Sequence, residues 1–170
     1  MNDFYFTSYS EDFDFSSFNC GDGDLDQYIK NQVEKDIAFG MCSCIVMMSS
    51  KNKEISGYFT LTPRSIGMQK LQSLIKQSNY PSLPFLLVGR LAIDKKYRGN
   101  KLSELIFSFI LKTIFDVSKV VKFVGIEVEA KNTSLIKKVY EPLGFLAISP
   151  NSRRLVYLID YQSLKDNYES

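Results

Sequence analysis

The segment "RLAIDKKYRGNKLSELIF", residues 90–107, decides the fold because it joins an apolar run to a helical pattern through a cationic turn. The first amides of a helix have no partner within the helix and lie at the positive end of its dipole, so such a turn can bind a phosphate. The same letters also fit a plain surface connector with solvated cations, and they match neither a Walker loop nor a dinucleotide fingerprint. Around Gly99 the turn carries four cationic side chains, namely Lys95, Lys96, Arg98 and Lys101.

The residues on either side of this turn predict a strand and a helix. Residues 85–94, "FLLVGRLAID", form a continuous apolar run, which is typical of a central strand. From residue 102 onward, apolar side chains recur every three or four positions, and this spacing predicts a helix. The positions concerned are Leu102, Leu105, Ile106, Phe109, Ile110, Thr113, Ile114 and Val117.

Other segments predict further strands. Residues 3–9 alternate loosely, and residues 41–66 read as a β-hairpin around the polar turn "SSKNKE". Residues 121–130 predict another strand, and residues 145–161 predict a second hairpin. Strands interspersed with helices favour one α/β domain with a mixed sheet, over residues 1–165, followed by a polar, flexible C-terminal tail at 166–170.

Helix boundaries follow from capping residues. Asp22 or Asp24 can cap a helix that stops near Gly40. Asn132 is the expected N-cap of a helix that closes near Pro142. A short helix could also lie within residues 67–84, and the polar residues 162–170 are expected to fray.

Composition limits the chemistry of the chain. A formal net charge of +2 over 170 residues does not identify a nucleic-acid binder. The sequence contains no histidine, which removes Ser-His-Asp and Cys-His catalysis and the commonest metal ligand. Cys20, Cys42 and Cys44 are too few for a disulfide framework, and core cysteines are favoured over a zinc site. We therefore expect a cytoplasmic protein with no metal, no signal peptide and no membrane span.

The cationic turn resembles the cofactor-binding segment of the GCN5-related N-acetyltransferase (GNAT) family, which reads Arg/Gln-x-x-Gly-x-Gly/Ala after a strand. Arg98 matches the first position, and Gly99 is the glycine often found directly after it. Lys101 stands at the central glycine and Ser103 at the final Gly/Ala, so the loop departs from the motif twice. A lysine side chain hinders close backbone approach to a ligand, whereas its charge could partly compensate.

A later segment, "EVEAKNTSLIKKVYEPLGF", resembles the part of the same family in which an Asn begins a helix and a Tyr precedes Gly-Phe. Asn132, Tyr140, Gly144 and Phe145 occupy those positions. The segments "FNCGDGDLDQYI", "GYFTLTP", "VGRLAID" and "GFLAISP" together resemble the acetyltransferase toxins of bacterial toxin–antitoxin systems. The resemblance covers nearly the whole chain. It implies the GNAT fold, a mixed, mostly antiparallel central sheet of six to seven strands flanked by helices.

The resemblance implies acetyl-CoA as the acetyl donor and an amine as the acceptor. Main-chain groups of Leu91, Ala92 and Ile93 would contact the pantetheine arm and the thioester carbonyl, where an N–H stabilises the oxyanion. The alternative is that "LAID" is only a core strand. The main-chain amides of the loop and the helix start would hold the pyrophosphate, and Arg98 and Lys101 would add positive charge. The residues implied are Arg98, Gly99, Asn100, Lys101, Leu102 and Ser103.

Tyr140 is the candidate general acid, which would protonate the departing CoA thiolate. Its place on the apolar face formed by Ile136, Val139 and Leu143 is also typical of a core aromatic residue. Asn132 would orient the pantetheine arm or only cap its helix.

Glu127 and Glu129 are the candidate general bases. They alternate with apolar residues on one strand face, directed toward solvent or a cleft, and solvated glutamates are the favoured interpretation. A lysine amine with a pKa of about 10.4 needs a base at neutral pH, whereas an α-amine near about 7.7–8.0 is partly neutral already. A site without an evident base therefore favours an α-amine, such as that of an amino acid on charged tRNA.

Three functions remain as alternatives. The first is a toxin-type acetyltransferase acting on aminoacyl-tRNA, with a ribbon-helix-helix antitoxin and a homodimer as expected partners. The second is an acetyltransferase for a small-molecule or protein amine, and the third is a binding module that has lost catalysis. The first requires a basic surface. Scattered cations could provide it: Lys30, Lys35, Lys70, Lys76, Lys137, Lys138, Arg153 and Arg154.

Overall fold

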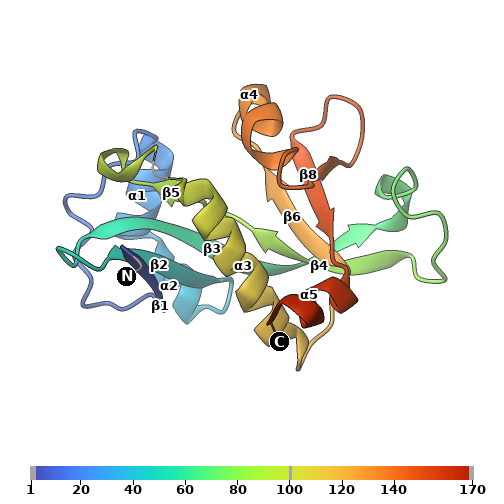
Figure 1. Cartoon of the computed structure of the whole chain (residues 1–170), viewed down its shortest axis with the longest axis horizontal. Coiled ribbons are helices and arrows are strands. Elements are labelled where there is room, and N and C mark those ends of the chain that lie inside the picture. The colour runs from blue at the N-terminus through green and yellow to red at the C-terminus, as the bar shows by residue number, and fades with distance from the viewer. Residues whose placement is uncertain (1–2, 100, 169–170) are drawn as a thin grey trace. The chain divides into compact units, whose positions relative to one another are not determined.

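The sheet begins with three antiparallel strands. In this computed structural model, which describes residues 3–99 and 101–168, β1 (Phe4–Ser8) pairs with β2 (Ser43–Ser49), and β2 pairs with β3 (Ile55–Gly67) (Figure 1). Val46 of β2 lies opposite Tyr58 of β3, and both side chains are buried. The predicted hairpin over residues 41–66 is therefore confirmed.

The apolar run at residues 85–94 does not form one strand. It is divided between β4 (Ser82–Val88) and β5 (Ala92–Ile93). Between them, the N–H of Gly89 donates to the carbonyl of Thr60 at 2.9 Å, and the N–H of Arg90 donates to Thr60 Oγ1 at 3.1 Å. The prediction of a continuous strand is wrong here, because a side-chain oxygen of β3 replaces a ladder acceptor.

Within the described ranges, the strands form one eight-stranded sheet in the order β1-β2-β3-β4-β6-β8-β7, with β5 beside β3 (Figure 1). The pairs β6–β8 and β7–β8 are antiparallel. The predicted mixed, mostly antiparallel sheet flanked by helices is confirmed, with more strands than expected because residues 85–94 are divided. The remaining strands are β6 (Gly125–Glu129), β7 (Leu146–Ala147) and β8 (Arg154–Leu158).

Two helices replace the single one predicted near the N-terminus. Asp22 caps α1 (Gly23–Asn31), because its side chain accepts hydrogen bonds from the N–H groups of Asp24 and Leu25 at 3.1 and 3.2 Å. A second helix, α2 (Val33–Ala38), starts after a break at Gln32. Both helices pack against β2 and β3 through a shared core of buried side chains.

Helix α3 (Leu102–Ser118) confirms the strongest helical pattern in the sequence. Leu102, Ile106, Ile110 and Ile114 are all buried, at the spacing of one helix face. A single 3₁₀ turn, η2 (Lys95–Tyr97), separates α3 from β5 together with the glycine-containing loop.

The C-terminal segment is more ordered than its composition suggests. Residues 161–168 form α5 (Tyr161–Tyr168), in which Leu164 is buried. The Tyr168 ring stacks on Phe115 with centroids 5.5 Å apart, and its hydroxyl donates to the carbonyl of Ser108 at 3.3 Å. The expectation that residues 162–168 fray is therefore wrong, and the predicted tail 166–170 is helical as far as residue 168. Residues 169–170 lie outside the described ranges.

The other helical elements are short. Residues 67–84 contain one 3₁₀ turn, η1 (Met68–Lys70), in place of the helix considered there. Asn132 caps α4 (Thr133–Leu135), which continues directly into a π-helix, η3 (Ile136–Tyr140). No helix in the described part of the chain is long and apolar enough to cross a membrane.

The chain divides into two compact units, formed by residues 1–62 with 88–105 and by residues 63–87 with 106–170. The first unit contains the predicted cofactor-binding residues from Leu91 to Ser103, and the second contains Glu127, Asn132 and Tyr140. Each unit has its own core. The second core is built from Ile66, Leu71, Leu83, Phe85, Ile148 and Val156.

Candidate active site

Strand β5 turns one edge of its main chain away from β3. The N–H of Asp94 donates to the carbonyl of Ser56 in β3 at 2.9 Å. Alternate residues of an antiparallel strand direct their main-chain groups toward the partner, so Ala92 and Asp94 face β3. The N–H and C=O groups of Leu91 and Ile93 therefore point the other way, as contacts with an extended ligand would require.

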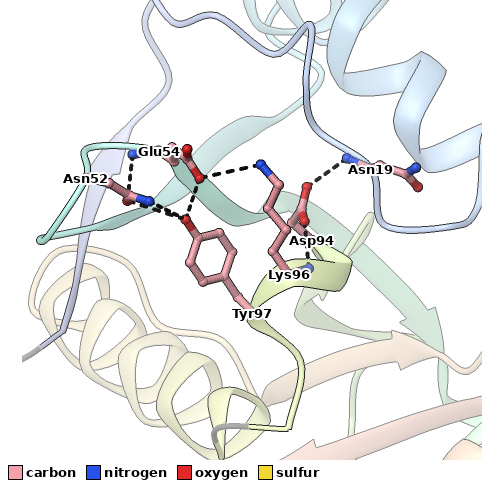
Figure 2. Close-up of polar contacts among 6 residues, drawn as sticks. All are labelled: Asn19, Asn52, Glu54, Asp94, Lys96 and Tyr97. Carbon is pink, nitrogen blue, oxygen red and sulfur yellow. Dashed lines mark hydrogen bonds and ion pairs between the residues drawn. The ribbon is translucent and has the colours of Figure 1, made fainter.

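Asp94 fixes the turn that follows β5. Its carboxylate is 3% exposed and accepts hydrogen bonds from the N–H of Asn19 at 2.8 Å and the N–H of Lys96 at 2.9 Å (Figure 2). The N–H of Lys95 also donates to the carbonyl of Asn19 at 3.0 Å. The segment before α1 is thereby joined to the turn, which loses most of its conformational freedom.

The β2–β3 hairpin holds the same turn from another direction, as Figure 2 shows. The hydroxyl of Tyr97 donates to Glu54 Oε2 at 2.7 Å, and Lys96 Nζ lies 3.6 Å from the same oxygen. Asn52 Nδ2 donates to the Tyr97 hydroxyl at 3.1 Å. The hydrogen bond from Tyr97 and the charge of Lys96 hold the pKa of the Glu54 carboxyl below its usual value.

Arg98 reaches back to the N-terminal segment. Its guanidinium donates a hydrogen bond to the main-chain carbonyl of Cys20, next to Asn19. The side chain predicted to add charge for a pyrophosphate thus also braces the loop, because this contact joins it to the segment that holds Asp94.

Gly99 and Lys101 adopt left-handed backbone conformations, with φ of +89° and +54°. No atom lies within 4 Å of the position that a Gly99 Cβ would occupy. Lys101 stands where the family motif has glycine, and its positive φ is the conformation that glycine favours. Asn100, the residue between them that was also predicted to bind the cofactor, lies outside the described residues.

Lys101 is also the last residue before α3. Its carbonyl accepts hydrogen bonds from the N–H groups of Glu104 and Leu105, both at 3.1 Å. The amides of Leu102 and Ser103 precede these bonds and have no partner within the helix. The Leu102 side chain is buried and Ser103 is exposed. This helix start therefore offers main-chain donors at the positive end of a 17-residue helix, an arrangement that favours anions.

The second unit contains a buried carboxylate, Glu127 on β6, which is 1% exposed. Arg154 Nε donates to Glu127 Oε1 at 2.5 Å, and Arg154 Nη2 contacts the same oxygen. Arg64 Nε lies 3.1 Å from Oε2 as an ion pair, although Oε2 has no hydrogen-bond donor among the described residues. The favoured interpretation of a solvated glutamate is wrong for Glu127. Its carboxylate is buried, and Arg64 of β3 and Arg154 of β8 balance its negative charge.

Glu129 lies on the same face of β6 as Glu127 but is exposed, as expected for a solvated glutamate. Its Oε1 is 3.9 Å from Arg153 Nη2. An exposed pair at this separation contributes little to stability. The role of general base stays a prediction for both glutamates.

Asn132 and Tyr140 lie at opposite ends of one short helical segment. The Asn132 side chain accepts hydrogen bonds from the N–H of Leu135 at 3.2 Å and the hydroxyl of Ser134 at 2.9 Å, which confirms it as an N-cap. The Tyr140 ring packs edge-on against Phe145 with centroids 5.6 Å apart. Burial raises the pKa of the Tyr140 phenol, so the hydroxyl stays protonated above neutral pH, as a general acid requires.

Sequence patterns missed the arginines that accompany Glu127. Arg64 and Arg154 come from two strands, and neither is near Glu127 in sequence. The available signal was a glutamate inside the apolar strand "GIEVEA", since a buried carboxylate needs cations or donors. Arg90 was also missed; its guanidinium carbon lies 3.7 Å from the centroid of the Tyr28 ring.

No three His, Cys, Asp or Glu side chains gather to hold a metal ion within residues 3–99 and 101–168. Cys20 and Cys44 are buried, and Cys42 is partly exposed. Burial raises the pKa of the Cys20 thiol to about 11 and that of Cys44 to about 12. These two thiols are therefore protonated core residues, as predicted.

No protein-family model matches the chain. Among curated proteins, a stretch of 91 residues is 25% identical to the "tRNA-acetylating toxin" of Mycobacterium tuberculosis. This stretch covers 54% of the chain and 54% of that relative, so the match spans about half the length of the curated protein.

Solved structures match over nearly the full length. AtaT complexed with acetyl-methionyl-tRNAfMet is 22% identical, with 98% of this chain and 99% of that chain covered and a TM-score of 0.84. A mutant AtaT toxin bound to the C-terminus of the antitoxin AtaR and to acetyl-CoA is 18% identical, with 99% and 100% covered and a TM-score of 0.78. The chain therefore has the fold of AtaT, and the predicted resemblance to acetyltransferase toxins is confirmed.

Replacing Glu127 with glutamine should destabilise the second unit, because two guanidinium groups would lose the anion between them. We expect a loss of about 2–3 kcal/mol in the free energy of unfolding. This is less than the loss of a fully buried ion pair would cause, because the Arg64 side chain is partly exposed to water. Urea denaturation measures this change. The matched control Glu129→Gln alters an exposed carboxylate and should change stability by less than about 0.5 kcal/mol. Equal stability of the two variants would contradict the role assigned to the arginines.

Proposed function

We propose that this chain is an N-acetyltransferase that moves an acetyl group from acetyl-CoA to a primary amine, and that the acceptor is the α-amine of an aminoacyl-tRNA. The observation that carries the proposal is the arrangement of residues 91–103. An outward-facing main-chain edge is followed by a braced turn and a helix start with left-handed residues. The AtaT structures with acetyl-methionyl-tRNAfMet and with acetyl-CoA support it.

The residues of the first unit fit coenzyme A. The amides of Leu102 and Ser103 would hold the pyrophosphate, and the absence of a side chain at Gly99 leaves room for close approach. Lys101 would add charge beside the phosphates. The main chain of Leu91 and Ile93 would align the pantetheine arm and orient the thioester carbonyl toward an N–H donor. When bound, acetyl-CoA supplies the activated acetyl group.

The second unit would supply proton transfer. The hydroxyl of Tyr140 is protonated at neutral pH and would give its proton to the leaving sulfur. Glu127 and Glu129 are the candidate acceptors for the proton that the amine loses. Asn132 would orient the pantetheine arm in addition to capping its helix.

The proposal includes a toxin role controlled by an antitoxin. AtaT binds the C-terminus of the antitoxin AtaR in a similar structure. We further infer a ribbon-helix-helix partner, a homodimer and a cytoplasmic location, where acetyl-CoA and charged tRNA are both present.

Incubation of the purified protein with radiolabelled acetyl-CoA and a mixture of charged tRNAs tests the proposal. We expect the label on the α-amine of the esterified amino acid, identified by mass spectrometry after mild hydrolysis of the ester. Uncharged tRNA serves as the control and should stay unlabelled. Label on only a small-molecule or protein amine would refute the RNA part of the proposal, and no binding of acetyl-CoA at millimolar concentration would refute the enzyme.

Replacing Asp94 with alanine should weaken acetyl-CoA binding. The amides of Asn19 and Lys96 would lose their acceptor, and the turn that leads to the proposed pyrophosphate site would become more mobile. We expect a rise of about 10-fold in Kd by calorimetry, in line with the loss of hydrogen bonds to a charged group. Asp94→Asn keeps one of the two acceptor oxygens and places an NH2 donor opposite the other N–H, so its Kd should lie between those of the wild type and Asp94→Ala. An unchanged Kd in Asp94→Ala would show that the brace does not position the loop.

Replacing Tyr140 with phenylalanine should lower kcat by about 10²–10³-fold, because the leaving sulfur loses its proton donor. The Kd for acetyl-CoA should stay within about twofold of the wild-type value. Tyr157→Phe is a matched control, since the Tyr157 ring also packs against Phe145, and it should retain kcat. Wild-type turnover in Tyr140→Phe would remove Tyr140 from the mechanism.

A further inference from the structure

The guanidinium of Arg90, two residues before β5 in the sequence, is held against a tyrosine ring of α1. Its central carbon lies 3.7 Å from the centroid of the Tyr28 ring, within the range of a cation–π contact. The N–H of Arg90 donates to Thr60 Oγ1 at 3.1 Å. Leu91, whose main chain faces away from β3, follows directly. The main chain of Arg90 is therefore fixed directly before the edge assigned to the thioester, and its side chain is fixed against α1.

The aromatic support under Arg90 is itself rigid. Tyr28 is 6% exposed on α1, and its hydroxyl donates to Asp36 Oδ2 at 2.9 Å. Gln32 Nε2 donates to Asp36 Oδ1 at 2.9 Å, so both carboxylate oxygens already have donors. The positive charge of Arg90 helps to lower the pKa of the Asp36 carboxyl, although no ion pair within 4.0 Å joins the two residues in the described part of the chain. The Tyr28 ring thus orients Arg90, and the hydrogen bonds of Asp36 go to Tyr28 and Gln32 and not to the guanidinium.

Arg90 is exposed, and no acceptor among residues 3–99 and 101–168 takes a hydrogen bond from its guanidinium. The ring covers one face of the guanidinium and leaves its N–H edge available. A planar, weakly hydrated guanidinium that is already oriented matches two oxygens of one phosphate group. An unsupported surface arginine would first have to lose side-chain entropy to bind in this way.

We propose that Arg90 binds a phosphodiester near the 3′ end of the acceptor RNA, and this inference rests on the proposed function. In an aminoacyl-tRNA, only the esterified amino acid and the terminal ribose separate the reacting amine from the nearest phosphodiester. A cation whose residue directly precedes the thioester edge is therefore within reach of that phosphate. The phosphates of acetyl-CoA are assigned to the start of α3, at the far end of the pantetheine arm.

Steady-state kinetics with two acceptors separate these sources of phosphate. One acceptor is the aminoacyl-tRNA that the wild-type protein acetylates best, and the other is the methyl ester of the same amino acid, which has the amine without phosphate. For Arg90→Gln we expect KM for charged tRNA to rise about 10–100-fold, the range for a lost charged hydrogen bond. The rate with the methyl ester and the Kd for acetyl-CoA should not change.

Two further variants complete the set. Arg90→Lys keeps the charge but loses the planar fork, so its KM for charged tRNA should be intermediate. Lys122→Gln removes another cation that lies over a tyrosine ring, 4.3 Å from the centroid of Tyr161, and should behave as wild type. Thermal unfolding of each variant establishes whether it is folded. If Arg90→Gln is not folded, Arg90→Lys serves as the test.

Salt dependence gives a readout that does not depend on turnover. Filter binding of uncharged tRNA at several salt concentrations yields the slope of log K against log salt. Loss of one single-strand phosphate contact should reduce the magnitude of this slope by about 0.7 in Arg90→Gln. Lys122→Gln should keep the wild-type slope.

An unchanged KM for charged tRNA in folded Arg90 variants would overturn the inference while the proposed function stands. A weaker Kd for acetyl-CoA in Arg90→Gln would also overturn it, because the phosphate would then belong to the donor. If the wild-type protein acetylates the methyl ester but no charged tRNA, the proposed acceptor fails, and the inference fails with it.

Discussion

The buried carboxylate of Asp94 holds together the segments on which the candidate site depends. A carboxylate that is 3% exposed is strongly destabilising unless donors surround it, and here the amides of Asn19 and Lys96 supply them. Lys96 is two residues from Asp94 in the sequence, whereas Asn19 belongs to the segment before α1. The hydrogen bond from Arg98 to the carbonyl of Cys20 repeats this connection at the start of the loop. Tertiary contacts therefore impose the loop conformation.

This imposed conformation explains how a lysine can occupy a glycine position. A left-handed φ costs a non-glycine residue roughly 1–2 kcal/mol, and a cation at a helix N-terminus opposes the helix dipole by up to about 1 kcal/mol. Lys101 has a φ of +54° directly before α3, so both costs apply to it. An anion bound there would remove the electrostatic cost, because the lysine charge and the helix dipole would then attract the same group. If the proposed pyrophosphate site is correct, the two costs at Lys101 are offset when the anion binds.

Features that depend on neighbouring residues could be predicted from the sequence, and features that depend on distant ones could not. The α3 stripe, the β2–β3 hairpin and the caps Asp22 and Asn132 all follow from residues close in sequence. The break at residues 89–91 escaped prediction because Thr60, on another strand, supplies the replacement acceptor. Helix α5 escaped it because a polar segment is held there by Phe115 and Ser108.

In the candidate site, too, contacts between residues distant in sequence could not be predicted. Arg98 and Gly99 could be proposed from the motif, and their cofactor-binding role stays a prediction. The arginines beside Glu127 could not be proposed, because they depend on how three strands meet. The environments of Glu127 and Glu129 bear on which kind of amine accepts the acetyl group in the proposed reaction. Glu127 is 1% exposed and already contacts two guanidinium groups, while Glu129 is exposed beside Arg153. An amine that is fully protonated at neutral pH, such as a lysine side chain, needs a free carboxylate close by. An α-amine, with a pKa of about 7.7–8.0, is partly neutral before it binds, so it does not require the carboxylate of Glu127, which is already paired.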